Sequence, residues 1–97
     1  MSTTSKRVIW KFPLDVCREQ EIGLHRVHDL LTIQVQNGQP TLWAMVHPET
    51  KPLSVMIRCY GTGNGNPLPD DEYIGTVQLD GFVWHYYKSE GGDDPNE

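Results

Sequence analysis

Between Leu30 and Val46 the chain reads LLTIQVQNGQPTLWAMV. Over the first half of this stretch apolar and polar side chains alternate, which is typical of a strand with one buried face. Asn37 and Gly38 both tolerate the positive φ angles that a type I′ turn requires, so the stretch predicts a β-hairpin. Pro40 has no N–H to donate, and we expect it to lengthen the loop or to place its strand at a sheet edge.

Further segments carry the same two-residue periodicity. One pair of them flanks Asp80-Gly81, which favours the same kind of turn. Pro13 is expected to end the first strand, because proline cannot donate to a ladder. Besides the first hairpin, the predicted strands are residues 7–12, 19–24, 52–60, 73–79 and 82–87.

Residues 24–31 allow a second interpretation. Leu24, Val27, His28 and Leu31 are separated by three and four residues, as on one face of a helix. No N-cap pattern precedes them, and a strand pattern follows at once. We therefore expect only a short helix or a turn there.

Together these patterns predict a mostly β protein. The expected architecture is a small antiparallel sheet of six to seven strands, barrel-like or sandwich-like, with at most one short helix. A chain of 97 residues has room for one domain, which we place at residues 6–88. Residues 1–5 and 89–97 are too polar to bury a face and are expected to be flexible tails.

The formal net charge of −5 is concentrated near the C-terminal end of the sequence, where Glu90, Asp93, Asp94 and Glu97 lie. The rest of the chain is close to neutral, so general nucleic-acid binding, which needs clustered lysine and arginine, is not expected. No apolar segment approaches the length of a membrane span. Two cysteines are few for a small secreted domain. We therefore expect a soluble cytoplasmic protein that does not bind membranes.

Five blocks of sequence resemble a known family. They are VIWKFPL (8–14), VQNG (35–38), LWA (42–44), YGTG (60–63) and PDD (69–71), the last followed by YIGTVQL (73–79). In order and spacing they are similar to a family of short, largely uncharacterised proteins of tailed bacteriophages and prophages. The chain departs from that family at residues 24–28, where members often carry a Pro and Gly turn, and in its acidic tail. The resemblance implies a setting, the cytoplasm of an infected bacterial host, rather than a particular chemistry.

Histidines and cysteines are present in numbers that invite a search for metal or catalytic sites. His25 and His28 are three residues apart, but the spacing fits no zinc finger or ribbon, so no metal site is expected. Cys59 alternates with Val55 and Ile57, which marks it as a core residue with an unreactive thiol. The sequence therefore predicts neither an enzyme nor a cofactor.

Candidate binding residues lie in a glycine-rich loop and on the last strand. The glycines invite comparison with phosphate-binding loops, but prolines rather than a helix follow them, which favours a flexible surface loop. The acidic residues beside the loop are expected to form a solvated edge. Aromatic residues on the last strand indicate protein contacts, base stacking or a strand covered on both faces. The predicted binding residues are Tyr60, Gly61, Thr62, Gly63, Asn64, Gly65, Asp70, Asp71, Trp84, His85 and Tyr86.

Three functions follow as hypotheses. The first is a non-enzymatic phage accessory protein that binds a host component, most simply a host protein, and in its sharper form inhibits host defence. The second is a protein that binds or sequesters a small nucleotide-like ligand. A pocket with backbone N–H donors and aromatic walls would favour this second hypothesis, whereas a flat apolar patch would favour a protein partner. The third is a structural phage component, which would form a symmetric homo-oligomer.

Overall fold

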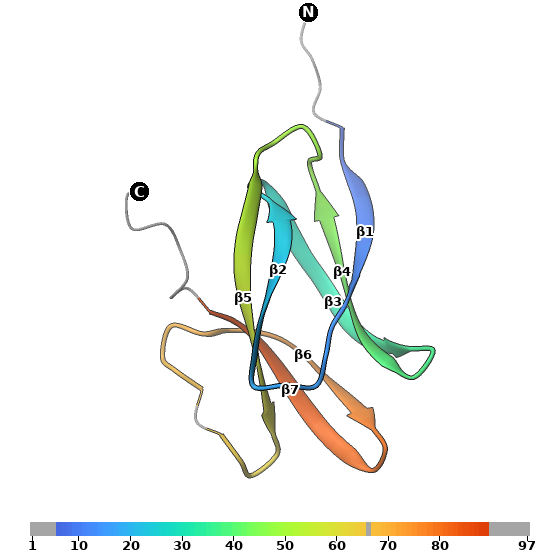
Figure 1. Ribbon diagram of the computed structural model, residues 1–97, viewed down its shortest axis with the longest axis vertical. Helices are drawn as coiled ribbons and strands as arrows, with labels where there is room; N and C mark the ends of the chain where they lie inside the picture. The colour runs from blue at the N-terminus through green and yellow to red at the C-terminus, as the bar shows by residue number, and fades with distance from the viewer. Residues whose placement is uncertain (1–5, 66, 90–97) are drawn as a thin grey trace, which may run out of the picture.

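The computed structural model describes residues 6–65 and 67–89, which form seven β-strands and contain no helix (Figure 1). The predicted mostly β fold is therefore confirmed. The strands are β1 (Val8–Pro13), β2 (Glu19–His25), β3 (His28–Gln36), β4 (Gln39–Val46), β5 (Pro52–Gly61), β6 (Glu72–Leu79) and β7 (Phe82–Ser89).

Two antiparallel sheets enclose one core. The first has the strand order β1-β4-β3, and the second has the order β2-β5-β7-β6. The sheets adjoin where β3 lies beside β6, and Gly75 packs there against Ile33. At the far edges, Trp10 of β1 and His25 of β2 bring their rings to 5.4 Å between centroids. The strands thus follow one another around the core like an incomplete barrel.

Both predicted type I′ hairpins are present. Asn37 and Gly38 have φ angles of 54° and 78°, and Asp80 and Gly81 have φ angles of 55° and 84°. Each pair connects two strands whose register closes directly on the turn. Both turns could be predicted from the sequence, because few residue pairs accept two successive positive φ angles.

The expectation for Pro40 was wrong. The turn keeps two residues, and Pro40 lies in β4, which is the central strand of its sheet. Pro40 is opposite Val35, one position beyond the pair that closes the turn, so its nitrogen points away from β3. On that side β1 has already ended, and only the carbonyl of Pro40 is used, accepting a hydrogen bond from the Leu14 N–H at 2.9 Å. The missing N–H therefore breaks no ladder bond.

The core is built from the inward side chains of both sheets. Strand β5 alternates buried and less buried residues, as its sequence predicts. The alternation predicted for β3 is confirmed only in part, because Ile33 is buried but Leu31 and Val35 are exposed. Tyr86 is the largest side chain that is fully buried, and its hydroxyl donates to the Asp15 carbonyl at 3.0 Å. The buried hydrophobic residues are Leu14, Leu24, Ile33, Leu42, Ala44, Val46, Val55, Ile57, Cys59, Val77 and Tyr86.

Residues 24–31 contain the end of β2, a turn at Arg26 and Val27 and the start of β3, so of the predicted short helix or turn the structure has the turn. The Arg26 N–H donates to the Lys51 carbonyl at 2.7 Å, and the Val27 carbonyl accepts from the His47 N–H at 3.1 Å. Backbone groups that a helix would pair locally are therefore paired with the connection between β4 and β5. Val27 is also 47 % exposed, so the apparent apolar stripe is not a buried face.

The predicted domain boundary needs one change at its C-terminal side. Ser89, which we assigned to the tail, is the last residue of β7 and is buried. The remaining tail residues, 1–5 and 90–97, lie outside the described residues.

Candidate functional site

The outer face of the β2-β5-β7-β6 sheet carries aromatic and polar side chains. Because Cys59 and Tyr86 point into the core, their neighbours Tyr60, His85 and Tyr87 point outward. The register places His85 directly opposite Tyr60 on one side, and opposite Thr76 of β6 on the other. These side chains therefore share one surface.

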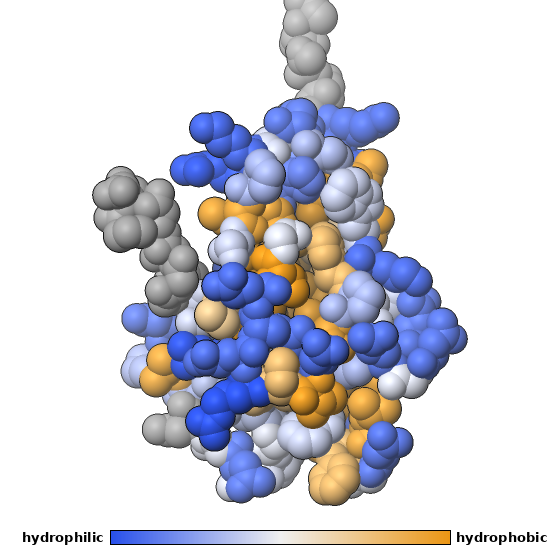
Figure 2. Space-filling model, viewed as in Figure 1, coloured by the Kyte–Doolittle hydropathy of each residue, from blue (hydrophilic) through white to orange (hydrophobic). Residues whose placement is uncertain are grey.

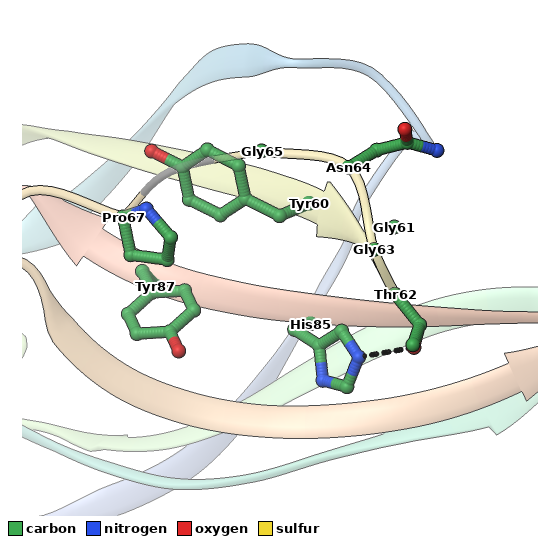
Figure 3. A pocket seen from close by; sticks show the side chains of 9 residues that line it. All are labelled: Tyr60, Gly61, Thr62, Gly63, Asn64, Gly65, Pro67, His85 and Tyr87. Carbon is green, nitrogen blue, oxygen red and sulfur yellow. Dashed lines mark hydrogen bonds between the residues drawn. The ribbon is translucent and has the colours of Figure 1, made fainter.

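The loop between β5 and β6 rises over this surface and forms a pocket of about 380 Å³. We call its described residues, 62–65 and 67–71, the glycine loop. Figure 3 shows the rings of Tyr60, Pro67 and Tyr87 at one end of the pocket, and His85 with Thr62 at the other. The lining residues are Tyr60, Gly61, Thr62, Gly63, Asn64, Gly65, Pro67, His85 and Tyr87.

The local structure of the loop requires glycine at two positions. Gly63 has a φ of 84° in a turn that is closed by the Asn64 N–H donating to the Gly61 carbonyl at 2.9 Å. Gly65 has a φ of 114°, and a Cβ added to it would lie 2.3 Å from the Tyr60 ring. The loop backbone therefore lies directly on that ring, and the glycine pattern is explained by the fold without a phosphate.

Asp71 attaches the far end of the loop to the sheet. Its Oδ2 accepts hydrogen bonds from the Leu68 N–H at 3.0 Å and from the Tyr60 hydroxyl at 3.3 Å. Asp70 is exposed. The expected solvated acidic edge is thus wrong for Asp71, whose carboxylate is partly buried because it caps the loop.

A chain of hydrogen bonds crosses the polar end of the pocket. Thr62 Oγ1 lies 2.7 Å from His85 Nε2, and His85 Nδ1 lies 3.0 Å from Thr76 Oγ1. Thr76 Oγ1 is in turn bonded to the Tyr73 hydroxyl. Both nitrogens of the imidazole are therefore engaged by hydroxyl groups, which hold the ring in one orientation.

The apolar end of the pocket is made by tyrosines. The Tyr60 and Tyr87 rings meet edge to face, with centroids 5.6 Å apart. Tyr73 contacts the other side of Tyr87 in the same manner, at 5.4 Å. Rings that support one another in this way form a rigid wall, which costs little entropy when a ligand binds against it.

Arg58 is the cation next to this wall, in register with Tyr87. Its guanidinium lies 3.3 Å from the carboxylate of Glu19. The neighbouring hydroxyl of Tyr60, more than the charge of Glu19, raises the pKa of Arg58 above its usual value. The positive charge is thus balanced by Glu19 and, at the loop, by Asp71, so the site has no excess of positive charge for an anion.

A second pocket of about 360 Å³ lies on the other side of the turn at residues 61–64. Trp84 lines it and packs against Gly61, where an added Cβ would lie 3.1 Å from the indole ring. The Phe82 ring lies 5.8 Å from the Trp84 ring. The lining residues are Gly61, Thr62, Asn64, Gly81, Phe82, Val83 and Trp84.

The structure thus divides the predicted binding residues into groups. The loop residues from Tyr60 to Gly65 and His85 line the first pocket, Trp84 lines the second, and Asp71 supports the loop. Tyr86 was wrongly included, because its side chain is fully buried in the core and out of reach of a ligand.

Tyr87, Thr76 and Tyr73 were missed by sequence reasoning, although signals for two of them were present. Tyr87 follows His85 by two residues and must share its face of the strand. The Asp80-Gly81 turn pairs Leu79 with Phe82. Counting outward from this pair along both strands places Thr76 opposite His85.

The cysteine and histidine residues form no second site in the described ranges. Cys59 is buried as predicted, and burial raises the pKa of its thiol. Cys17 is exposed, and both thiols are free. His25 and His28 each place Nδ1 near a backbone carbonyl, at 2.9 Å from Thr50 and 2.7 Å from His25 respectively. Among residues 6–65 and 67–89, no three metal-binding side chains come together.

A family model described as a domain of unknown function, DUF7352, matches residues 5–96, and the chain belongs to this family. No curated protein and no solved structure matches the chain. Over the ranges that the structure describes, no helix is long and apolar enough to cross a membrane.

Proposed function

We propose that this member of the DUF7352 family binds a small uncharged molecule with a planar ring, such as a nucleobase or nucleoside, in the pocket between Tyr87 and the glycine loop. The observation that carries the proposal is the combination of aromatic wall and polar end in one pocket of about 380 Å³ (Figure 3). Pockets of a few hundred Å³ with a few fixed polar groups are typical of small-molecule sites.

Hydrogen-bonding groups at the pocket match the edge of a nucleobase. Thr62 supplies a side-chain hydroxyl, whereas the amide of Asn64 points away from the aromatic rings and His85 (Figure 3). Within the described residues, the N–H groups of Gly63 and Gly65 have no hydrogen-bond partner and can donate to a ligand. A nucleobase offers both donors and acceptors on its edge and a flat face for tyrosine, so it suits this set of groups.

The charges near the pocket favour an uncharged ligand over a phosphate. Arg58 is paired with Glu19, and the carboxylate of Asp71 lies at the Tyr60 hydroxyl. A free phosphate group would need an unpaired cation or a helix N-terminus. We therefore propose that the protein recognises the ring of the ligand rather than a phosphate group.

We further propose that the protein binds its ligand without transforming it. In the described part of the chain, both hydrogen bonds of His85 go to threonine hydroxyls and none goes to a carboxylate that would orient it as a general base. The buried thiol of Cys59 has a raised pKa and is a poor nucleophile. The resemblance to phage proteins supports a role in the cytoplasm of an infected host, where such a protein would sequester a signalling or defence molecule.

The test is direct binding of adenosine, guanosine, cytidine and uridine, measured by calorimetry and by amide chemical shifts. We expect at least one nucleoside to bind and to shift the amides of Gly63 and Gly65. In Tyr87→Leu the affinity should fall at least about fivefold, because an aromatic wall contributes ~1–3 kcal/mol per stacked base. Phe82→Leu, an aromatic substitution on the same strand at the second pocket, should leave the affinity unchanged. Equal affinities in the two variants, or no nucleoside binding, would contradict the proposal.

A protein partner is the second candidate function, and the edge strands favour it. Strands β1 and β2 each have a neighbour on one side only in their sheets, so their outer backbone groups can pair with an added strand. On β1, Ile9 is 60 % exposed and Trp10 is also exposed, and Figure 2 shows further apolar surface between polar side chains. Capture of a host protein that is lost in Ile9→Ser but kept in Tyr87→Leu would favour this candidate over the ligand pocket.

A further inference from the structure

We infer that the hydroxyl of Thr62 is the group that contacts the polar edge of the ligand, and that His85 determines whether this hydroxyl donates or accepts. The inference rests on the proposed function, since it concerns which ligands the same pocket prefers. It would make the protein prefer a ring with a carbonyl edge when His85 is protonated. Thr62 and His85 would then be the specificity-determining residues of the pocket.

The geometry that supports the inference is the continuous hydrogen-bond chain from Thr62 through His85 and Thr76 to Tyr73. Thr62 and His85 line the pocket, and Tyr73 at the opposite end of the chain is 55 % exposed to solvent. Each hydroxyl has a single hydrogen to donate, whereas a neutral imidazole has one nitrogen that donates and one that accepts. The direction of one bond therefore fixes the direction of the others.

With a neutral imidazole the chain has two possible directions. In the first, His85 Nε2 carries the hydrogen and donates to Thr62, so the Thr62 hydroxyl is free to donate to a ligand. In the second, Thr62 donates its hydrogen to Nε2, and its oxygen can only accept from a ligand. The site then adapts to either kind of ligand edge.

With a protonated imidazole only one direction remains. Both ring nitrogens carry hydrogen, so both Thr62 and Thr76 must accept. The hydrogen of Thr62 is then directed away from His85, toward the pocket, and that of Thr76 toward Tyr73. A ligand carbonyl is satisfied by this arrangement, whereas a ligand amine faces the hydrogen of Thr62 and is left with only the second lone pair of that oxygen, which weakens its hydrogen bond.

Histidine is the side chain whose charge changes near neutral pH, so the preference for a ligand carbonyl over a ligand amine should change with pH. The other ionisable groups on this face, among the described residues, lie on all four strands and in the glycine loop. They are Glu19 and Glu21 of β2, Tyr60 and Arg58 of β5, Tyr73 of β6 and Tyr87 of β7, with Asp71 bonded to Tyr60. The remaining histidines belong to β2, to β3 and to the segment after β4. His85 is thus the histidine of this surface, and its protonation can be followed separately.

Uridine and cytidine are suitable probes, because they share ring size and sugar but present opposite groups on one edge: uridine has a carbonyl at C4 and an N–H at N3, whereas cytidine has an amine at C4 and an acceptor nitrogen at N3. We expect the ratio of uridine affinity to cytidine affinity to rise about fivefold between pH 8 and pH 5.5, which is the effect of one hydrogen bond. The midpoint should coincide with the titration of His85 measured by NMR. Thr62→Ser should keep the pH dependence, whereas Thr62→Val and His85→Gln should abolish it.

The hydrogen-bond chain itself is tested in the protein without ligand. Imidazole nitrogen shifts of His85 should change mainly at Nε2 in Thr62→Val and mainly at Nδ1 in Thr76→Val. Unchanged shifts, or a pH-dependent ratio that survives His85→Gln, would overturn the inference while leaving nucleoside binding intact. If no nucleoside binds to the unsubstituted protein at either pH, the proposed function fails and the inference fails with it.

Discussion

At the scale of single residues, Tyr86 shows how context changes the meaning of an aromatic side chain. It shares a strand with His85 and Tyr87, yet it lies fully buried and donates its hydroxyl hydrogen bond to the Asp15 carbonyl. Burial, more than its contact with Cys59, raises the pKa of Tyr86. Its hydroxyl therefore links the β1–β2 connection to the core, and its protonated form contributes to stability.

This arrangement predicts a loss of stability at alkaline pH. The unfolded chain releases the Tyr86 proton near pH 10, while the folded protein retains it, so the folded state loses relative stability as the pH rises above 10. The free energy of unfolding should fall by about 1.4 kcal/mol per pH unit from this residue. Urea denaturation at pH 8 to 11 measures the effect.

The comparison variant is Tyr86→Phe. This substitution should lower the free energy of unfolding by about 1 kcal/mol at pH 8, because the hydrogen bond to Asp15 is lost. The fall in the free energy of unfolding at alkaline pH should also be shallower than in the unsubstituted protein. Tyr73→Phe, at an exposed tyrosine, should keep the full decline. An identical alkaline slope in the Tyr86→Phe protein would show that this hydroxyl does not carry the effect.

At the scale of elements, the glycine loop and β7 together create the site. The loop is held at one end by the turn at Gly63 and at the other by Asp71, and between them its backbone lies on the Tyr60 ring. The element has few side chains of its own in the core. Its position depends on the contact of its backbone with the Tyr60 ring and on the carboxylate of Asp71. Substituting its glycines should therefore have different effects on stability.

Gly65→Ala and Gly63→Ala should therefore lower the free energy of unfolding by different amounts. Gly65→Ala combines a strained φ with a Cβ placed 2.3 Å from the Tyr60 ring and should destabilise by about 3 kcal/mol. Gly63→Ala has an unfavourable φ but open space around it, and should cost about 1 kcal/mol. Urea unfolding monitored by tryptophan fluorescence measures both values. Equal costs would mean that the loop does not rest on Tyr60.

At the scale of the whole molecule, two sheets share a core and adjoin along β3 and β6. The contact there is between Ile33 and Gly75, next to the register shift of β6 between Tyr73 and Gly75. A glycine at this position allows the two sheets to approach closely. The same strand carries Thr76, so the junction of the sheets also positions one end of the hydrogen-bond chain.

The junction is tested by Gly75→Val against Gly23→Val. A Cβ at Gly75 would already lie 3.4 Å from the Ile33 Cβ, so the additional methyl groups should force the sheets apart and cost about 2 kcal/mol. Gly23 lies in the edge strand β2 with nothing within 4 Å of an added Cβ. Valine there should be neutral or mildly stabilising, because it favours the strand. Thermal unfolding that gives the same shift for both variants would rule out a tight junction.

The sequence by itself determined the strands, both type I′ turns and the inward face of β5, because these features depend on neighbours a few residues apart. It also located the glycine loop and His85. Only the tertiary structure decided that Pro40 fits a central strand and that Asp71 caps the loop, because both outcomes depend on which distant backbone atoms lie nearby. The chain from Thr62 to Tyr73 likewise needs three separate segments to meet. Local periodicity specifies which way a side chain points, whereas the packing of strands specifies what it meets.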